Sequence, residues 1–488
     1  MTITGMGMPL KSFRMKTAAI TSTAKAAHRI ITIVVILTII VSENRNPVKS
    51  LAWVTVLLLL PGVGIVLYVF FGRSIKNKRM ISRRNRRKLK KREKMPPFDV
   101  KKHNVSDATR QQIKMARSLT GTYFYPANDI TIFTEGRTKF DSLIEDLKNA
   151  EKSINIQYYI FEDDNIGNRI KQILMEKARA GVKVRLIYDH VGSFQVKNRF
   201  FNEMRKAGVE AYPFFKVTFK ILGSRLNWRN HRKIVIIDGK IAYIGGMNVA
   251  DRYITGDKFK VWRDTHLRLT GPGTAALEYS FAVDWSFMGL PLIELNSPST
   301  AAVNAGGDGV QLITSGPTDQ WSNVEVMFHR AIANARQRVY IQTPYFLPTE
   351  GLFKALVTAS LAGVDVRIMI PVRPDSAILR YASFSYITSC LRAGIKIYLY
   401  QPGMLHAKVL IIDDEITSVG STNFDFRSFE HNFEANLFIY SKGFNERMTK
   451  IFLSDQNQSE RVMPANWKNR PRHKKILESI LRLLSPIL

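Results

Sequence analysis

A pattern of 18 residues occurs twice in the chain and constrains its fold more than any other feature of the sequence. It occupies residues 231–248 and 406–423, and both copies read H-x-K, four apolar residues, D, six residues, G-[GS]-x-N. In each copy a turn follows the Asp and a second apolar run follows the turn, which predicts two strands joined by a hairpin. A chain that carries this unit twice is expected to have two similar halves.

Further segments repeat in the same order and indicate the fold class. In each half, a helix ends at a Gly and an alternating apolar run follows, which is typical of a buried strand. Strands alternating with helices favour an α/β fold with a largely parallel sheet, flanked by helices, in each half. The matching pairs are residues 149–157 with 334–342, 180–188 with 362–370, and 206–212 with 392–398.

Composition predicts the boundaries between the parts of the chain. The stretch NSPSTAAVNAGGDG is small, polar and Gly-rich, so we expect the two halves to meet there. The expected parts are an N-terminal membrane anchor (1–72), a basic juxtamembrane linker (73–110), a first half (111–300), a second half (301–455) and a C-terminal amphipathic tail (456–488).

An apolar segment near the N-terminus has the length of a membrane span. Residues 51–72 hold 22 positions without a charge, enough for roughly 30 Å of hydrocarbon. Trp53 and Tyr68 stand near its two ends, as interfacial aromatic residues do. The sequence Pro61-Gly62-Val-Gly64 in its middle predicts a kink or a broken helix. A buried helix of a soluble domain is the alternative interpretation.

A second apolar run, residues 30–41, precedes the first and is extended by small residues on its N-terminal side. We expect two spans, at about 24–42 and 51–72, joined by the short loop SENRNPVKS as a transmembrane helical hairpin. A cleaved signal peptide is the rival interpretation, because basic residues precede the run. No A-x-A-like cleavage site follows it, and another apolar segment comes too soon.

The charge distribution predicts an anionic partner and a topology. The net charge is +32, which implies nucleic acid or an anionic membrane surface. Residues 73–94 contain 13 Lys or Arg and one acid, so the positive-inside rule places them, and everything after them, in the cytoplasm. The single cysteine, Cys390, excludes an intramolecular disulfide.

The C-terminal segment also has the pattern of a membrane-surface element. In residues 473–488 the apolar residues fall on one face of a helix, with basic residues at or beyond its edges. An interfacial helix fits this pattern. A helix docked on the protein's own core fits it almost as well. The apolar residues are Ile476, Ile480, Leu483, Leu484 and Ile487.

The repeated pattern carries the residue types of a phosphoryl-transfer site. On a strand, positions i and i+2 share a face, so His231 should point with Lys233, and His406 with Lys408. An imidazole beside an ammonium forms an anion site that also holds a nucleophile or proton donor. Two copies in a duplicated chain make a structural role for these histidines a poor explanation.

Other positions of the pattern are expected to support this site. Asp238 and Asp413 follow their histidines by seven residues, an odd offset, so on a regular strand they face away from the reacting group. We interpret them as supports within the catalytic motif and not as proton carriers. Small residues at Gly245, Gly246, Gly420 and Ser421 should let a phosphate approach the backbone, with polar contacts from Asn248 and Asn423.

The repeated pattern is the HKD motif, and the chain resembles the phospholipase D superfamily and, within it, the bacterial cardiolipin synthases. The resemblance covers nearly the whole chain. The segments that carry it include RNPVKSLAWVTVLLLLPGVGIVLYVFFGR, WRDTHLRLTGP, QTPYFLPTEGL, MLHAK and STNFDFRSFEHNFEAN. The resemblance implies two pseudo-symmetric phospholipase D-like halves that bring both HKD motifs onto one phosphate.

The resemblance also implies roles for individual residues. One histidine forms a phosphohistidine, and family analogy favours His231, with His406 as acid and then base. Lys233, Lys408, Asn248 and Asn423 would hold the phosphoryl oxygens. No metal or other cofactor is implied. A carboxylate should orient each histidine, and the candidates are Asp264, 33 residues beyond His231, and Glu434, 28 residues beyond His406.

The expected reaction transfers a phosphatidyl group from one phosphatidylglycerol to another and releases glycerol. The expected partners are phosphatidylglycerol and other anionic lipids, without nucleic acid, at a bacterial inner membrane with the catalytic body in the cytoplasm. A phospholipase D-type hydrolase, or transfer to serine or phosphatidylethanolamine, shares this chemistry. A phosphodiesterase of nucleic acid or a membrane-tethered binder explains less of the sequence.

Overall fold

The computed structural model describes residues 30–37, 47–68, 80–92, 104–215, 228–296, 307–483 and 485. The chain divides into two compact units. One comprises residues 1–75 and 218–227, and the other comprises residues 76–217 and 228–488. We call the second unit the catalytic body. The predicted boundary between the halves, residues 296–309, falls mostly outside the described residues.

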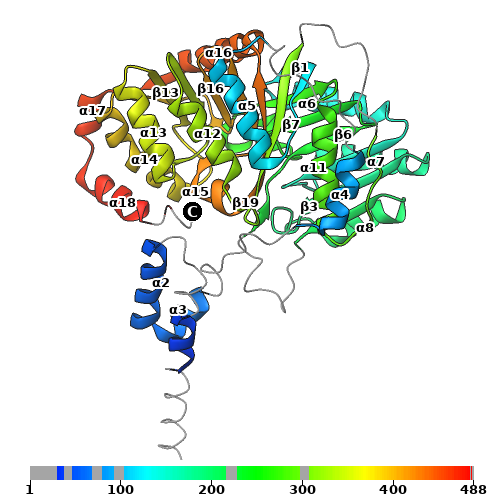
Figure 1. Cartoon of the computed structure of the whole chain (residues 1–488), viewed down its shortest axis with the longest axis horizontal. Helices are drawn as coiled ribbons and strands as arrows, with labels where there is room; N and C mark the ends of the chain where they lie inside the picture. The colour runs from blue at the N-terminus through cyan, green and yellow to red at the C-terminus, as the bar shows by residue number, and fades with distance from the viewer. Residues whose placement is uncertain are drawn as a thin grey trace, which may run out of the picture. The chain divides into compact units, whose positions relative to one another are not determined.

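Within the described residues, 16 strands of the catalytic body form one sheet, seen in Figure 1. Its order is β20-β14-β13-β11-β16-β17-β19-β10-β1-β9-β7-β6-β2-β3-β4, and β5 pairs with β19. The strands up to residue 270 are β1 (Tyr125–Phe133), β2 (Ser153–Tyr158), β3 (Lys183–Asp189), β4 (Glu210–Phe214), β5 (Arg229–Asn230), β6 (Ile234–Ile237), β7 (Ile241–Gly245), β8 (Trp262–Arg263) and β9 (His266–Thr270). The later strands are β10 (Asp308–Ser315), β11 (Arg338–Gln342), β12 (Phe346–Leu347), β13 (Asp365–Pro371), β14 (Lys396–Tyr400), β15 (Met404–Leu405), β16 (Val409–Ile412), β17 (Ile416–Gly420), β18 (Phe424–Asp425), β19 (Asn432–Tyr440) and β20 (Ser459–Arg461).

The strand order reads as two similar runs that meet at the antiparallel pair of β1 and β10. From β1 outward the order is β9, β7, β6, β2, β3, β4, and from β10 outward it is β19, β17, β16, β11, β13, β14. The duplication in the sequence is therefore a duplication of the fold, and the halves share one continuous sheet.

The expectation of a largely parallel sheet in each half is wrong. Within each half, only β2, β3 and β4, and their counterparts β11, β13 and β14, run parallel to one another. The neighbours of β6, β7 and β9 are antiparallel, as are those of β16 and β17, and β19 is antiparallel to β17 and β10. The short β5 crosses from the first half and pairs with β19 in parallel. The physical reason is that each HKD motif folds as a tight hairpin, whereas parallel strands need a helical crossover.

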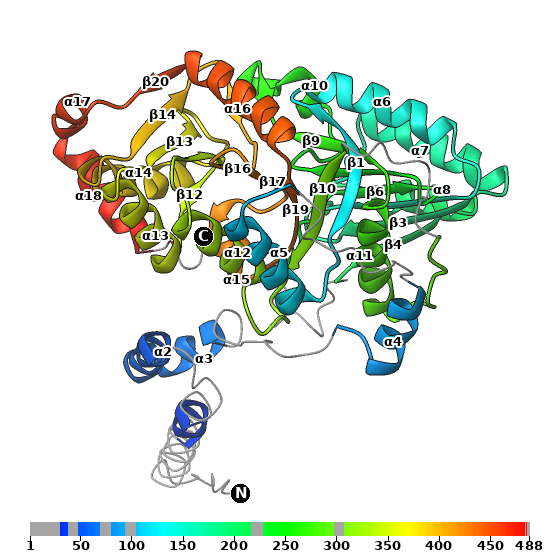
Figure 2. The same ribbon diagram turned by 45° about the horizontal axis from the view of Figure 1, so that its top comes forward.

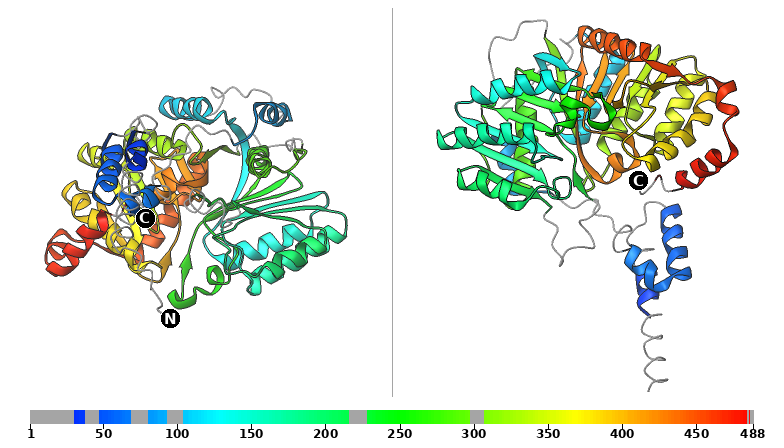
Figure 3. Two further views of the ribbon diagram at one scale, coloured as in Figure 1. Left: turned by 90° about the horizontal axis from the view of Figure 1, so that it is seen from below. Right: turned by 180° about the vertical axis from the view of Figure 1, so that it is seen from behind.

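Helices cover both faces of the sheet (Figure 2). The first half buries an apolar core under α6 (Gly136–Lys148), α7 (Asn165–Arg179) and α8 (Asn198–Lys206), with α11 (Thr274–Phe287) on the opposite face. The second half repeats this with α12 (Asn323–Ala333), α13 (Glu350–Leu361) and α14 (Ala377–Arg392) opposite α16 (Lys442–Asn457). The short helices are α10 (Arg252–Thr255), the 3-10 turn η4 (Asp257–Phe259), α15 (Phe426–Glu430) and α17 (Pro464–Lys468). Figure 3 shows both layers from below and from behind.

One helix packs with the second half, although its residues from 111 onward were predicted to belong to the first half. Helix α5 (Asp107–Thr120) crosses the predicted boundary at residue 111. Its buried Ile113 and Ala116 pack in the apolar core of the second half, and Gln311 of β10 donates to the Ile113 carbonyl. Tertiary packing places this helix with strands that follow it by some 200 residues.

The apolar segment 51–72 is a broken helix in its described part. Helix α2 (Pro47–Leu59) ends before Leu60, and α3 (Pro61–Leu67) starts with Pro61 at its first turn. This break was expected from the proline. The ring centroids of Trp53 and Tyr68 lie 5.5 Å apart, whereas a straight helix would separate them by roughly 22 Å. The two rings therefore do not mark opposite ends of one straight span, contrary to the prediction from their positions in the sequence.

Among the described residues, no helix has both the length and the hydropathy of a membrane span. Residues 30–37 are helical, and the rest of the predicted first span lies outside the described residues. The two predicted spans therefore stay a prediction.

The predicted C-terminal amphipathic helix is α18 (Arg472–Arg482). It packs on α14 through Leu481, and Arg482 lies over the Tyr386 ring. Ile476 and Ile480 on another face remain 60% and 55% exposed. The helix thus docks on the protein, as one interpretation predicted, and also presents an apolar face; its location at a membrane surface stays a prediction.

Candidate active site

Each HKD motif forms the expected hairpin, β6–β7 in the first half and β16–β17 in the second. Asp238 and Asp413 stand in the turns with φ of 54° and 47°. Asp238 accepts hydrogen bonds from the backbone N–H groups of residues 151–153 at 2.7–2.9 Å, and Asp413 does the same for residues 336–338. These carboxylates hold the hairpin turn to the start of the neighbouring strand.

The H-x-K residues were predicted to lie on the hairpin strands, and this prediction is wrong. Strands β6 and β16 begin one residue after Lys233 and Lys408. The residues before them cross to the other half, where β5 pairs with β19 and β15 pairs with β8. Accordingly, the His231 N–H donates to the Phe433 carbonyl at 2.9 Å. The His406 N–H donates to the Arg263 carbonyl at 2.7 Å. This crossing brings the two histidines together.

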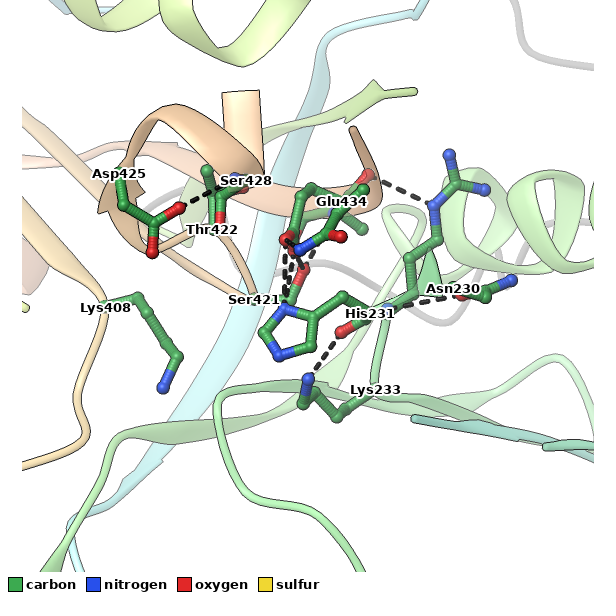
Figure 4. A network of polar contacts seen from close by, with 12 residues as sticks. Asn230, His231, Lys233, Lys408, Ser421, Thr422, Asp425, Ser428 and Glu434 are labelled. Carbon is green, nitrogen blue, oxygen red and sulfur yellow. Dashed lines mark hydrogen bonds and ion pairs between the residues drawn. The ribbon is translucent and has the colours of Figure 1, made fainter. Parts of the chain in front are cut away.

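Each histidine contacts the carboxylate of the opposite half, and the pairing inferred from chain distance is wrong. His231 Nδ1 lies 2.9 Å from Glu434 Oε1, as Figure 4 shows. His406 Nδ1 lies 2.7 Å from Asp264 Oδ2. Both carboxylates are fully buried. Asp264 and Glu434 are thus placed to orient histidines as expected, but each serves the partner motif, because β8 and β19 are the strands that the H-x-K segments meet.

The small residues after the hairpins face these carboxylates or the adjacent strands, and not the cavity that both histidines line. A Cβ atom on Gly246 would lie 2.1 Å from Asp264 Oδ1. At the equivalent position the Ser421 hydroxyl donates to Glu434 (Figure 4). Gly245 and Gly420 lie against the backbone of the adjacent strands β9 and β19. The expectation that they admit a phosphate is therefore not met, since none of the four lines the cavity.

The two lysines are buried beside their histidines. Lys233 Nζ donates to the His231 carbonyl at 2.5 Å and lies over the Tyr159 ring. Lys408 Nζ contacts the His406 carbonyl and lies 2.7 Å from Nδ1 of the same histidine. An ammonium has no lone pair, so a protonated Nδ1 donates to Asp264 and not to the lysine.

A cavity of about 350 Å³ lies between the halves of the catalytic body and exposes both histidines. Asn248 and Asn423 also line it, as expected. Asn248 Oδ1 accepts from the Ile160 N–H, while the Oδ1 atom of Asn423 has no hydrogen-bond partner among the described residues. Over the same residues, no group of three His, Cys, Asp or Glu side chains could hold a metal ion.

Comparison with known proteins decides the family. The model of the PLD-like domain of cardiolipin synthase matches residues 143–259 and 328–456. A phospholipase D-nuclease N-terminal model matches residues 30–73. The chain is 38% identical to cardiolipin synthase of Geobacillus kaustophilus over 463 residues, covering 93% of this chain and 92% of that one. The chain belongs to the cardiolipin synthase family.

Other cardiolipin synthases match the chain over a similar length. The major cardiolipin synthase of Bacillus subtilis is 37% identical over 478 residues, covering 94% of this chain and 98% of that one. The protein is thus a phosphatidyltransferase of the phospholipase D superfamily, in phospholipid biosynthesis. A phosphatidylserine synthase from Haemophilus influenzae has the same fold, with a TM-score of 0.59 at 14% identity, covering 77% of this chain and all of that one.

Burial lowers the pKa of both histidines and so favours their neutral forms. It lowers the pKa of His231 to about 4, although Glu434 opposes the shift. Burial and Lys408 also lower the pKa of His406. Burial alone would raise the carboxylate pKa values, but Lys408 and His406 hold the pKa of Asp264 below its usual range. His231 and Lys233 do the same for Glu434.

Several cavity residues were missed by the sequence analysis. Arg229, Arg252, Lys258 and Arg427 line the cavity together with the acids Asp257, Asp375 and Asp425, and Tyr345 donates a hydrogen bond to Asp375. Arg252 is also paired with Glu162 at 2.9 Å. Arg229 stands two residues before the first motif, and Arg427 four after the second. Arginine close to the motif was the available signal for an anion site.

Proposed function

We propose that this enzyme transfers a phosphatidyl group from one phosphatidylglycerol to the hydroxyl of a second, yielding cardiolipin and glycerol. One observation carries the proposal. Two histidines from opposite halves line one cavity, and each presents Nδ1 to a buried carboxylate, which leaves Nε2 for the substrate. This arrangement suits a displacement at phosphorus in two steps.

In the first step, His231 Nε2 forms a bond to phosphorus, and the bond from phosphorus to the glycerol oxygen breaks. His406, protonated on Nε2 as well as on Nδ1 when it acts, gives its Nε2 proton to that oxygen, and glycerol leaves. In the second step, the hydroxyl of another phosphatidylglycerol gives its proton to His406 and attacks phosphorus, and the bond to His231 breaks. Glu434 supports the charge that forms on His231.

The cavity's lining supports a phosphodiester substrate. Arg229, Arg252, Lys258 and Arg427 bring positive charge to the cavity that Asn248 and Asn423 also line. We assign the phosphoryl oxygens to these amides and to Lys233 and Lys408 behind them. A volume of about 350 Å³ is at the lower end for ligand sites, which suits headgroups without their acyl chains.

Exposed apolar surface supports a location at the membrane. Ile31, Val34 and Leu59 are more than half exposed, as are other apolar residues of residues 30–37, α2 and α3. Surface of this kind is costly in water and suits hydrocarbon. We propose that the N-terminal segments anchor the enzyme in the inner membrane and that α18 lies at its surface. The basic residues 73–94 favour a cytoplasmic catalytic body.

The test is to incubate the purified full-length chain in detergent with phosphatidylglycerol alone and to analyse the lipids by mass spectrometry. Cardiolipin and glycerol in equal amounts are expected. Phosphatidic acid without cardiolipin would identify a hydrolase instead. A second incubation with added serine or phosphatidylethanolamine tests the other acceptors, and His231→Ala serves as the inactive control.

A further inference from the structure

A second cavity of about 850 Å³ lies elsewhere in the catalytic body and shares no lining residue with the catalytic cavity. Helix α4 (Arg83–Arg92) forms one wall, and α4 lies beside α11 (Figure 1). The end of α5, strand β10 and residues 318–323 complete it. The buried Leu89 attaches α4 to the body. The charged segment 73–94, expected to be a linker, thus includes part of a built site.

The charges that line this second cavity are mostly positive. Arg83, Arg86 and Lys90 reach it from α4, and Asp319 is the one acidic residue among the described lining side chains. No ion pair within the described part of the chain involves these three basic residues. Arg232 also lines the cavity, but Asp284 already neutralises it at 2.6 Å. The cavity therefore carries a surplus of positive charge.

Two buried hydroxyl groups in the second cavity have no partner. The Ser280 and Thr318 side chains are 5% and 7% exposed, and neither hydroxyl makes a hydrogen bond within the described residues. Buried hydroxyl groups are nearly always paired. Together with the guanidinium groups, they are donors for the oxygens of a phosphate.

The lining also includes apolar side chains. Met115 and Leu119 of α5, Val283 of α11 and the 58% exposed Trp321 contribute to the wall. A ligand that satisfies both parts of the lining carries a phosphate on an apolar or glycerol-like body. A free phosphate would use only the basic side.

The chain connection favours a membrane lipid as the source of that phosphate. Arg83 follows the apolar segment 51–72 by 11 residues, which reach at most about 40 Å when extended. If that segment is anchored in the bilayer, as proposed above, α4 stays within reach of the headgroups. This step alone rests on the proposed membrane attachment.

We propose that the second cavity binds the phosphate-bearing headgroup of an anionic phospholipid, separately from the lipids that react. Arg83, Arg86 and Lys90 neutralise the phosphate, Ser280 and Thr318 donate hydrogen bonds, and Trp321 covers the glycerol backbone. Asp319 opposes binding by its charge, so its removal should strengthen it.

The test measures binding, in the full-length chain with His231→Ala, so that lipid is not consumed and the outcome does not depend on turnover. Short-chain phosphatidylglycerol is titrated and bound lipids are counted by native mass spectrometry. The triple variant Arg83→Ala, Arg86→Ala, Lys90→Ala should weaken one binding event at least tenfold. The matched control Arg84→Ala, Arg87→Ala, Lys91→Ala removes equal charge from the same helix outside the cavity and should change it less than twofold.

Two further variants keep the proposal testable if the triple variant unfolds. Ser280→Ala with Thr318→Val should weaken the same binding event, and Asp319→Asn should strengthen it severalfold. Equal loss in both triple variants, or no change with Asp319→Asn, would overturn the proposal. Short-chain phosphatidylcholine should not bind there. Full competition by millimolar inorganic phosphate would make the site one for free phosphate and would overturn the lipid assignment.

Discussion

Glu434 Oε1 lies 2.9 Å from Nδ1 of His231, although 203 residues separate them and they belong to opposite halves. The reciprocal pair, Asp264 with His406, is separated by 142 residues. Neither half therefore contains a complete histidine–carboxylate pair. This interdependence gives a physical reason for two motifs in one chain and leads to the first prediction.

Neutralising the crossed carboxylates should affect different steps. Glu434→Gln should slow formation of the phosphohistidine at least tenfold, even with an activated phosphodiester. The reason is that a neutral amide no longer supports the charge that forms on His231. Asp264→Asn should leave that step fast with an activated leaving group, which needs no protonation, but slow it with phosphatidylglycerol. Rapid-quench kinetics with both substrates measure the difference. The reverse pattern would mean that each carboxylate acts on the histidine of its own half.

Both histidines should be essential, with unequal residual chemistry. His231→Ala and His406→Ala should each lower turnover by at least about 100-fold without unfolding the protein. Only His406→Ala should still form an adduct with an activated phosphodiester, on His231. Peptide mapping without acid quench detects it, since phosphohistidine is acid-labile. An adduct on His406 in His231→Ala, with none in the reciprocal variant, would exchange the two roles.

The rate should depend on pH in a bell shape. His231 must be neutral to attack, and burial lowers its pKa to about 4, so kcat/KM should fall as pH drops through about 4. Burial also lowers the pKa of Lys408 to about 8, so charge on this lysine, and with it the rate, should be lost as pH rises through about 8. Lys408→Met should be slower and should lack the limb near pH 8. An unchanged alkaline limb in that variant would assign it to another group.

Asp238 should matter for stability more than for chemistry. Asp238→Ala removes the acceptor for three backbone N–H groups. It also places an alanine at φ of 54°, a left-handed conformation that aspartate adopts more readily. The free energy of unfolding should fall by about 1–3 kcal/mol. The rate per folded molecule should stay within a few-fold of wild type. Chemical denaturation and activity assays at low temperature measure both. A large loss of rate in a stable variant would assign Asp238 a chemical role.

The catalytic body should lie in the cytoplasm. The 13 basic residues within 73–94 disfavour translocation of that segment. A reporter that is active only in the cytoplasm, fused after Leu488, should therefore be active. The matched fusion with a reporter that needs export should be silent, and activity of that second fusion would overturn the topology.

Local features of the sequence determined much of this protein. Periodicity and the repeated segments identify the alternating strands and helices, because these depend on neighbours within a few residues. The hairpin at Asp238-Gly239 follows from turn chemistry. The convergence of His231 and His406 on one cavity was also predicted, because a duplicated motif acts on one phosphate in the family that the chain resembles.

Only the tertiary structure decided which residues meet. The order along the chain pairs His231 with Asp264, and His406 with Glu434, but the segments before β6 and β16 cross to the other half and exchange the carboxylates. Packing likewise draws α5 into the second half and α4 onto α11, where it forms the second cavity. Such contacts depend on strand pairing and burial between residues 100 to 300 positions apart, and local patterns carry no information on that pairing.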